Sequence, residues 1–325
     1  MRGGLLAVHA HPDDESLATG ALLATRAAAG ERVTVVTCTR GERGEVIDTL
    51  SHPTGLAHLE GDGPALAAHR EAELDRALAA LGVTDRLFLD TVDVADRPGA
   101  EPARFEDSGM AWVAPGIAGP APESGPTAFA RVPLDIAARR LAAVVRDRRP
   151  AVVATYEAGG GYGHPDHVRT HEVTVRALEL AADPRAAVVG EPWAVPERWE
   201  VVDPAPDVRA ARRSLASDTS VRRLVDGCGL TLPDPDGDLP PVAVPATGMD
   251  RAGTVAVDVA PVLDQVLAAL SAHTTQVQHV GRVASTGGGV LARYALSNGV
   301  LAPVLATAHL RRAAAAAMTP VGSVR

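Results

Sequence analysis

Two short segments of the chain carry side chains that could bind a metal ion and activate water. They are the run HPDDE at residues 11–15 and the run HPDH at residues 164–167. Two imidazoles and one carboxylate suit Zn²⁺, and a catalytic zinc site leaves a fourth position open for water. Carboxylates that are not ligands remain available as a base. The two segments together therefore predict a zinc site that can activate a water molecule.

Each segment follows a predicted strand. Residues 5–10 (LLAVHA) form a short apolar run that is typical of a buried parallel strand, and residues 151–155 (AVVAT) form a second strand. In open α/β sheets, ligands bind outside the carboxyl ends of the strands. Both segments are therefore expected where a functional site would lie.

Both segments also have simpler structural interpretations. The first could be a solvated turn in which an acid caps a helix, and His164 and His167 could cap a helix or make buried hydrogen bonds. These two histidines are three residues apart, so they share one face of a helix that begins at His164. Because the segments bring complementary ligands to two strand ends, a shared metal site explains them better than separate structural roles.

The surrounding sequence predicts the elements that would position this site. Ser16 is expected to cap a helix that ends at Gly30, and a second helix is expected to begin at Pro64 and end at Gly82. Strands and helices alternate, which predicts the α/β class with a Rossmann-like, doubly wound, mostly parallel sheet. The further predicted strands are 32–38 and 86–89, and the predicted helices are 17–29, 64–81 and 134–148.

The rest of the chain is less regular. Residues 98–133 are rich in Gly and Pro and are expected to form a long excursion over the edge of the sheet. We expect a catalytic core over residues 1–185 and a smaller C-terminal α+β part over residues 186–325 that completes the substrate pocket. In that second part, strands are predicted at 199–203 and 253–259, a helix at 261–272 and a loop at 233–248.

Composition excludes several classes of protein. Of the 325 residues, 46% are hydrophobic and 22% are charged, which is the balance of a soluble globular protein. The net charge of −9 and the lack of a basic tract argue against nucleic-acid and anionic membrane partners. No apolar run approaches the roughly 20 residues that span a bilayer, and Leu5–Val8 is too short for a signal peptide. Cys38 and Cys228 make no disulfide framework, so a cytoplasmic location is expected.

The metal-binding segments also carry a family resemblance. AHPDDE at 10–15 together with GHPDH at 163–167 resembles the LmbE/PIG-L family of metal-dependent N-deacetylases. The resemblance extends over most of the chain and is weakest at 98–133 and 230–250. The runs that resemble one branch of the family, the deacetylases of mycothiol biosynthesis, are TVVTCTRGERGEV at 34–46, DSGM at 107–110, GGGYGHPDH at 159–167, AHTTQV at 272–277 and ALSN at 295–298.

The resemblance implies metal-binding and catalytic roles for residues of both segments. His11, Asp14 and His167 are expected to bind one Zn²⁺ per subunit. Asp13, beside the ligand Asp14, is expected to be the general base that accepts a proton from the attacking water. The same donors also accept Fe²⁺ or Co²⁺, so Fe²⁺ is an alternative metal in cells.

Five further residues receive roles from the same resemblance. His164 is expected to stabilise the oxyanion or act as an acid, and Tyr162 to polarise the substrate carbonyl. Arg70 and Asp107 are expected to hold sugar and inositol hydroxyls, although an exposed helical arginine and a turn acid are the simpler interpretations. Glu15 is expected to orient a metal ligand from outside the coordination sphere.

The activity that the resemblance implies is hydrolysis of an acetamide on a small amino-sugar substrate. The favoured substrate is N-acetylglucosaminyl-inositol (GlcNAc-Ins), which would give glucosaminyl-inositol (GlcN-Ins) and acetate in mycothiol biosynthesis. The alternatives are an amidase of mycothiol S-conjugates, a deacetylase of another N-acyl amino sugar, and a non-catalytic zinc- or sugar-binding protein. The amidase branch has a lysine after HPDDES that this lysine-free chain lacks, and a pure binder would not need Asp13. The sequence makes no prediction of oligomeric state.

Overall fold

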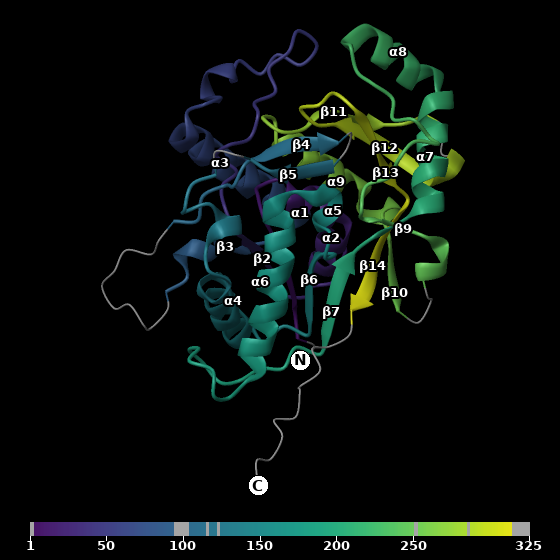
Figure 1. Ribbon diagram of the computed structural model, residues 1–325. Coiled ribbons are helices and arrows are strands. Elements are labelled where there is room, and N and C mark those ends of the chain that lie inside the picture. Colours follow the sequence, from purple (N-terminus) through teal and green to yellow (C-terminus); the bar gives the residue numbers. More distant parts are fainter. Residues whose placement is uncertain are drawn as a thin grey trace.

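The fold is built around one seven-stranded sheet. The computed structural model describes residues 3–93, 104–114, 117–121, 124–249, 253–284 and 287–313. The strand order of the sheet is β10-β14-β7-β6-β1-β2-β3 (Figure 1). The strands are β1 (Leu5–His9), β2 (Val33–Thr37), β3 (Asp85–Phe88), β6 (Val152–Tyr156), β7 (Glu197–Val201), β10 (Thr254–Asp258) and β14 (Thr307–Ala313).

Five neighbouring strands of this sheet are parallel. β1 pairs with β2 on one side and with β6 on the other, and β3 and β7 extend the parallel part outwards. β14 pairs antiparallel with both β7 and β10, so β14 runs opposite to the other six strands of the sheet. The mostly parallel α/β sheet predicted from the sequence is confirmed.

Helices lie along both faces of the sheet and over the edge at which the parallel strands end. The prediction for the helix at 64–81 is accurate, since it begins after Asp62 and ends at Gly82 in the left-handed conformation. None of the described helices is both long and apolar enough to cross a membrane. The helices are α1 (Asp14–Ala18), α2 (Gly20–Ala28), α3 (Gly63–Leu81), α4 (Leu134–Arg148), α5 (Gly160–Gly163), α6 (Pro165–Ala182), α7 (Ala205–Ser217), α8 (Thr219–Cys228) and α9 (Leu263–Ala272).

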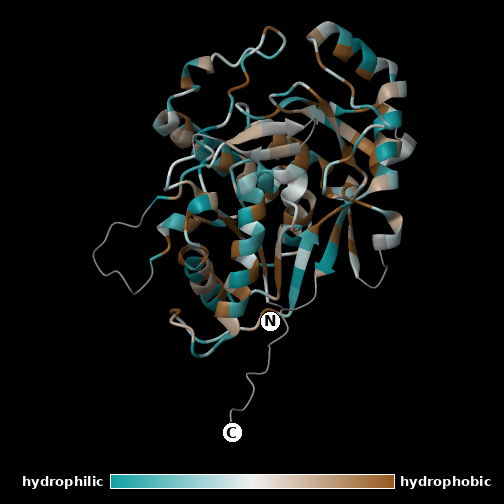
Figure 2. Cartoon of the chain, viewed as in Figure 1, coloured by the Kyte–Doolittle hydropathy of each residue, from teal (hydrophilic) through white to brown (hydrophobic). Residues whose placement is uncertain are grey.

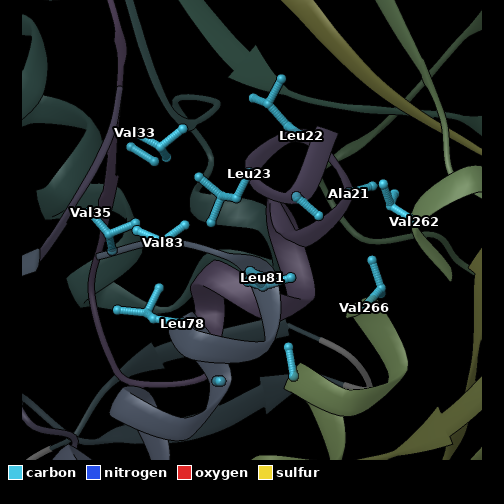
Figure 3. Close-up of a cluster of buried hydrophobic side chains, with 14 of the residues drawn as sticks. Ala21, Leu22, Leu23, Val33, Val35, Leu78, Leu81, Val83, Val262 and Val266 are labelled. Carbon is cyan, nitrogen blue, oxygen red and sulfur yellow. The ribbon is translucent and has the colours of Figure 1, made fainter. Parts of the chain in front are cut away.

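Side chains of β1 alternate between two hydrophobic layers. Leu5 and Ala7 join the layer formed with α2, α3 and α9, part of which is shown in Figure 3. Leu6 and Val8 join the opposite layer, formed with α4 and α6, whose ribbons carry both hydrophobic and hydrophilic stretches (Figure 2). Successive residues of a strand face opposite sides of the sheet, so a strand covered on both faces needs an uninterrupted apolar run.

The single helix predicted at 17–29 is wrong at its start. The helical segment begins at Asp14 and is divided at Thr19 into α1 and α2. Ser16 lies inside α1, where its hydroxyl donates to Oε1 of Glu15 rather than capping a helix. The acidic residues after β1 therefore form the first turn of a helix.

The second half of the chain contributes to the main sheet and also forms a smaller one. β7, β10 and β14 complete the main sheet. The smaller sheet is antiparallel and contains β11 (Gln278–Arg282), β12 (Val290–Ala295) and β13 (Leu301–Leu305), with α7 beside it (Figure 1). The α+β character predicted for this part is confirmed, whereas the division at residue 185 stays a prediction.

The excursion predicted at 98–133 contains regular structure. β4 (Met110–Ala114) and β5 (Ile117–Pro120) pair antiparallel, and Phe129–Arg131 form a short 3₁₀ helix. The parts at 98–103, 115–116 and 122–123 lie outside the described residues. Figure 1 shows the β4–β5 pair near α1 and α5. The predicted excursion did not include these short strands, because the high Gly and Pro content of the segment obscures them.

Candidate active site

The two predicted segments meet at the carboxyl end of the parallel strands. β1 leads into the HPDDE turn and α1, and its neighbour β6 leads through α5 into α6. β2 lies on the other side of β1, so the chain order changes direction between β1 and β6. Such a change of direction opens a crevice at the edge of a doubly wound sheet. The sheet therefore places the two histidine-containing segments side by side.

Hydrogen bonds determine which nitrogen of His11 is free. Its Nε2 lies 3.2 Å from Oδ2 of the buried Asp166 and 3.6 Å from Oδ1 of Asp107. Its Nδ1 lies 3.3 Å from Oδ2 of Asp14. Burial lowers the pKa of His11, but Asp107, Asp14 and Asp166 outweigh it and raise that pKa well above its ordinary value. A ring that releases the Nδ1 proton to a metal ion and donates from Nε2 to Asp166 presents its lone pair on Nδ1. Nδ1 is therefore the nitrogen of His11 that can bind a metal ion.

His167 presents its Nε2 to the same point. Its Nδ1 lies 3.2 Å from the carbonyl oxygen of Gly160, to which it can donate. Its Nε2 is buried and has no hydrogen-bond partner among the described residues, although Oδ1 of Asp14 lies 3.2 Å away. A buried nitrogen without a partner is unfavourable unless a ligand satisfies it. The lone pair on Nε2 of His167 is therefore available to a metal ion.

Asp14 lies between these two nitrogens at the spacing of a metal site. Four-coordinate zinc with bonds near 2.0–2.1 Å holds neighbouring donor atoms about 3.3 Å apart. The Asp14 oxygens lie 3.3 Å from Nδ1 of His11 and 3.2 Å from Nε2 of His167. Burial alone would raise the pKa of Asp14, but the imidazoles of His167 and His11 outweigh it and hold that pKa well below its ordinary value. The ionised carboxylate and the two lone pairs therefore fit a divalent cation.

His164 offers a hydrogen-bond donor rather than a third imidazole ligand. Nitrogens of His11, His164 and His167 all lie within 4.8 Å of one another. However, His164 caps α6, and its Nδ1 accepts a hydrogen bond from the Asp166 amide at 3.1 Å. Burial and the neighbouring histidines lower the pKa of His164 well below its ordinary value, which favours the neutral ring. A neutral ring that accepts at Nδ1 carries its proton on Nε2, where no lone pair remains for a metal.

Asp13 stands in a strained turn between the candidate ligands His11 and Asp14. Its backbone φ is 121°, and a residue held in such a region costs on the order of 1–3 kcal/mol. Its amide donates to Oε2 of Glu15 at 2.9 Å, and its Oδ2 lies 3.2 Å from Nη2 of Arg70. Burial raises the pKa of Asp13 to about 6, against the opposing charge of Arg70. Its position is therefore fixed from both its amide and its carboxylate.

Arg70 is buried, so the interpretation as an exposed helical arginine is wrong. The residue is 3% exposed, and its guanidinium donates to the carbonyl oxygens of Pro12 and Gly41 in addition to contacting Asp13. Gly41 must be small here, because an added Cβ would overlap this guanidinium. Arg70 therefore links α3 to the turn after β1 and to the loop after β2.

Tyr162 lies in the single turn α5, within the glycine-rich loop that joins β6 to α6. The centroid of its ring is 5.2 Å from that of His167 and 6.0 Å from that of His164. Glu157 accepts a hydrogen bond from the amide of Gly161 at 2.8 Å, which ties the loop to the end of β6. The loop therefore brings a phenol close to both histidines of α6.

Asp107 faces the site from the segment before β4. Its Oδ1 accepts a hydrogen bond from the Gly109 amide at 2.8 Å and lies 3.6 Å from Nε2 of His11. The amide of the next residue, Ser108, donates to Oδ2 of Asp166 at 2.9 Å. Burial alone would raise the pKa of Asp107, but His11 outweighs it and holds that pKa below its ordinary value. Asp107 is therefore an ionised residue of the site as well as a turn acid.

All the predicted site residues except Glu15 line one cavity of about 430 Å³. Arg43, from the loop after β2, and Met110, at the start of β4, also line its wall. Gln276 and Asn298 complete it from the C-terminal part. A concave site of this size that combines apolar walls with a few polar groups suits a small molecule.

Comparison with known proteins identifies the family. Residues 6–178 match the family model described as PIG-L: GlcNAc-PI de-N-acetylase. The chain belongs to this PIG-L family. It is also 45% identical over 309 residues to the 1D-myo-inositol 2-acetamido-2-deoxy-alpha-D-glucopyranoside deacetylase of Kineococcus radiotolerans, covering 94% of this chain and 76% of that protein. Proteins of similar name from Thermobifida fusca and Saccharopolyspora erythraea are 39% and 42% identical, covering 91% and 94% of this chain and 87% and 88% of theirs.

Several residues of this PIG-L site were not predicted from the sequence. Asp166 holds His11, and its place inside the HPDH run was the signal that could have revealed it. Tyr156 stacks on His167 with ring centroids 4.3 Å apart. His273 bonds to Glu15 across 258 positions of sequence, and no local pattern indicates that pairing.

Proposed function

We propose that this chain is a zinc-dependent deacetylase that hydrolyses the acetamide of GlcNAc-Ins, giving GlcN-Ins and acetate in mycothiol biosynthesis. Curated relatives that are 39–45% identical over more than nine-tenths of this chain carry the name of a deacetylase of this substrate. The observation that carries the proposal is the convergence of Nδ1 of His11, Asp14 and Nε2 of His167 beside the carboxylate of Asp13.

Zinc is the metal that we propose for the donors His11, Asp14 and His167. Two imidazoles and a carboxylate are a familiar zinc set, and Fe²⁺ binds the same donors. When bound, the ion lowers the pKa of a water molecule and draws charge from the substrate carbonyl. Asp166 and the Gly160 carbonyl support this set, because they leave the required nitrogen of each imidazole unprotonated.

Asp13 is proposed as the group that takes the proton from the attacking water. It lies between the proposed ligands His11 and Asp14 in the sequence. Its side chain borders the same cavity as the donors. Arg70 and Glu15 hold its carboxylate and its amide, which restricts the positions that the base can take. A base must lie within hydrogen-bond reach of the proton it removes, so this restriction favours catalysis.

His164 and Tyr162 are proposed as donors to the oxyanion of the tetrahedral intermediate. The tautomer of His164 places a proton on Nε2. Burial raises the pKa of Tyr162, so its hydroxyl keeps the proton that it would donate. Donors that are already oriented stabilise the developing charge without reorganisation. The amine leaves with a proton that Asp13 returns. His164 would supply that proton only from its imidazolium form, which its lowered pKa disfavours.

Arg70 and Asp107 are proposed to bind hydroxyls of the sugar and the inositol. Both side chains border the cavity, and the Asp107 carboxylate is ionised and can accept hydrogen bonds. Arg70 would have a second role, since its guanidinium already holds the turn that contains Asp13. Glu15 would support the site from behind Asp13 through the Asp13 amide.

A turnover assay of the zinc-loaded protein tests this function. GlcNAc-Ins and a mycothiol S-conjugate are offered separately, and the release of free amine is measured. We expect kcat/KM for GlcNAc-Ins to exceed that for the conjugate at least about tenfold, in line with the discrimination that pocket contacts supply. The opposite preference would assign the amidase activity, and no turnover of either compound would reject the proposed substrate.

The Asp13→Ala variant tests the proposed mechanism. It should retain zinc and lose about 10²- to 10⁴-fold in kcat, which is the usual contribution of a general base. Turnover at the wild-type rate would refute the role proposed for Asp13.

A further inference from the structure

The segment between α9 and β11, residues 273–277, contacts both α1 and α3. His273 contacts Glu15 in α1, and Thr275 bonds to Glu73 in α3. The segment belongs to the C-terminal part of the chain. The mechanism proposed above uses neither His273 nor Thr275, so their contacts call for another explanation.

A continuous line of hydrogen bonds runs from His273 to Asp13. Nε2 of His273 lies 2.7 Å from Oε1 of Glu15, and Oε2 of Glu15 accepts the amide of Asp13 at 2.9 Å. The Ser16 hydroxyl also donates to Oε1. The side chains of His273 and Glu15 are both 0% exposed, so water does not compete for these bonds. One oxygen of Glu15 is thus held by His273 and Ser16, and the other holds Asp13.

Asp13 requires such support because its backbone is strained. A φ of 121° persists in a non-glycine residue only when surrounding contacts impose it. Those contacts are the bond from its amide to Glu15 and the ion pair of its carboxylate with Arg70. If the amide is released, the turn can relax and move the carboxylate. A displacement of about 1 Å from the reacting geometry can lower a rate about 10²-fold.

We propose that His273 is a positioning residue for Asp13, which it holds in place through Glu15. The inference rests on the proposed function, in which Asp13 takes the proton from water. A purely structural role for His273 would be to satisfy the buried charge of Glu15, with no specific consequence for Asp13. The two roles predict different results once Asp13 is no longer a base.

Thr275 provides a matched control from the same segment. It is also 0% exposed, and its hydroxyl donates to Oε2 of the buried Glu73 at 2.7 Å. Thr275→Val therefore removes a hydrogen bond to a buried carboxylate without touching the line from His273 to Asp13. Any decrease in kcat that arises only from weaker packing of this segment should appear in Thr275→Val as well.

The test measures kcat and KM for GlcNAc-Ins, zinc content and melting temperature in a set of full-length variants. His273→Leu removes the donor at similar size, and His273→Gln keeps an N–H donor near the position of Nε2. We expect His273→Leu to lower kcat about 10- to 100-fold with KM and zinc content within about twofold of wild type. His273→Gln should restore most of the rate, and Thr275→Val should stay within about threefold of wild type.

Combination with Asp13→Asn decides between the two roles. In that background, His273→Leu should change the residual rate less than about twofold, because the base that it positions is gone. The inference would be overturned if His273→Leu lowered kcat by the same factor in both backgrounds. It would also be overturned if Thr275→Val lowered kcat as much as His273→Leu, or if His273→Gln did not restore kcat. Should His273→Leu not fold, Glu15→Gln takes its place with the same expectations. The wild-type rate on GlcNAc-Ins reports separately on the proposed function, since the ratios between variants can be measured on any N-acyl substrate that is hydrolysed.

Discussion

At the scale of single residues, the site depends on the hydrogen bonds that its histidines already make. Asp166 engages Nε2 of His11, and the Gly160 carbonyl engages Nδ1 of His167. The other nitrogen of each ring faces the Asp14 carboxylate. Outer partners of this kind orient metal ligands and raise their basicity. The affinity for metal should therefore depend on residues that never touch the ion.

Asp166→Ala should weaken zinc binding about 10- to 100-fold, the usual effect of losing such an outer partner. Without the carboxylate, His11 can rotate and take the other tautomer. Competition between the protein and a chromophoric chelator measures the affinity. Ser108→Ala is the control, because it removes a hydroxyl that bonds to Asp166 but leaves the pair of Asp166 and His11. Equal losses in the two variants would contradict the role assigned to Asp166.

The residues that form the proposed metal site were predictable, whereas those behind them were not. The two motifs place their ligands within a few positions of one another, and the residue types indicate the chemistry. Asp166 meets His11 across 155 positions, and His273 meets Glu15 across 258. Such pairings arise only when the sheet has assembled. The HPDH run draws attention to Asp166 without indicating its partner, and no local pattern indicates the pairing of His273 with Glu15.

At the scale of elements, the residues that begin and end a helix explain which helix boundaries were predicted correctly. α3 spans Gly63–Leu81, close to the predicted 64–81, because a proline begins it and Gly82 ends it. The helix predicted at 17–29 begins instead at Asp14, because the bond of Asp13 to Glu15 and its contact with the distant Arg70 set the turn before it. Helix boundaries were thus predictable where caps are local and unpredictable where distant groups impose the backbone.

Asp62→Ala should lower the free energy of unfolding by about 1 kcal/mol, the typical contribution of an N-cap. The Asp62 side chain accepts a hydrogen bond from the Ala65 amide, which would otherwise lack a partner in the first turn of α3. Urea unfolding monitored by circular dichroism measures the change. Asp62→Asn keeps an acceptor and should remain close to wild type, so an equal loss in both variants would point to charge rather than capping.

At the scale of the whole molecule, the C-terminal part completes both the sheet and the site. β14 inserts between β7 and β10, and the segment after α9 reaches Glu15. Alternating strands and helices predict a parallel sheet but not the order of its strands, because strand pairs far apart in sequence depend on the packing of all the layers. The sequence therefore indicated the fold class and left the route of residues 186–325 open.

Asp203 lies where this C-terminal part meets the main sheet. It begins the short strand β8 (Asp203–Pro204), which pairs with β9 (Ala243–Val244), and it borders a second cavity of about 380 Å³. Burial, together with the nearby charge of Asp207, raises the pKa of Asp203 to about 6. The unfolded carboxyl titrates near 3.9, so between these pH values the folded state binds more protons than the unfolded state.

The free energy of unfolding should therefore contain a contribution from Asp203 that decreases as the pH rises from about 4 to about 6 and then stays constant. Asp203→Asn removes this titration at nearly the same shape. Because the side chain is only partly screened from water, we expect the variant to be about 1–2 kcal/mol more stable than wild type at pH 7.5 and nearly equal to it at pH 4. Urea unfolding of both proteins across this range measures the difference, in which the contributions of all other groups cancel. Asp207→Asn should give a smaller gain of the same sign, since burial is the larger cause. A variant that is less stable than wild type at pH 7.5 would show that the Asp203 carboxylate is stabilised where it lies.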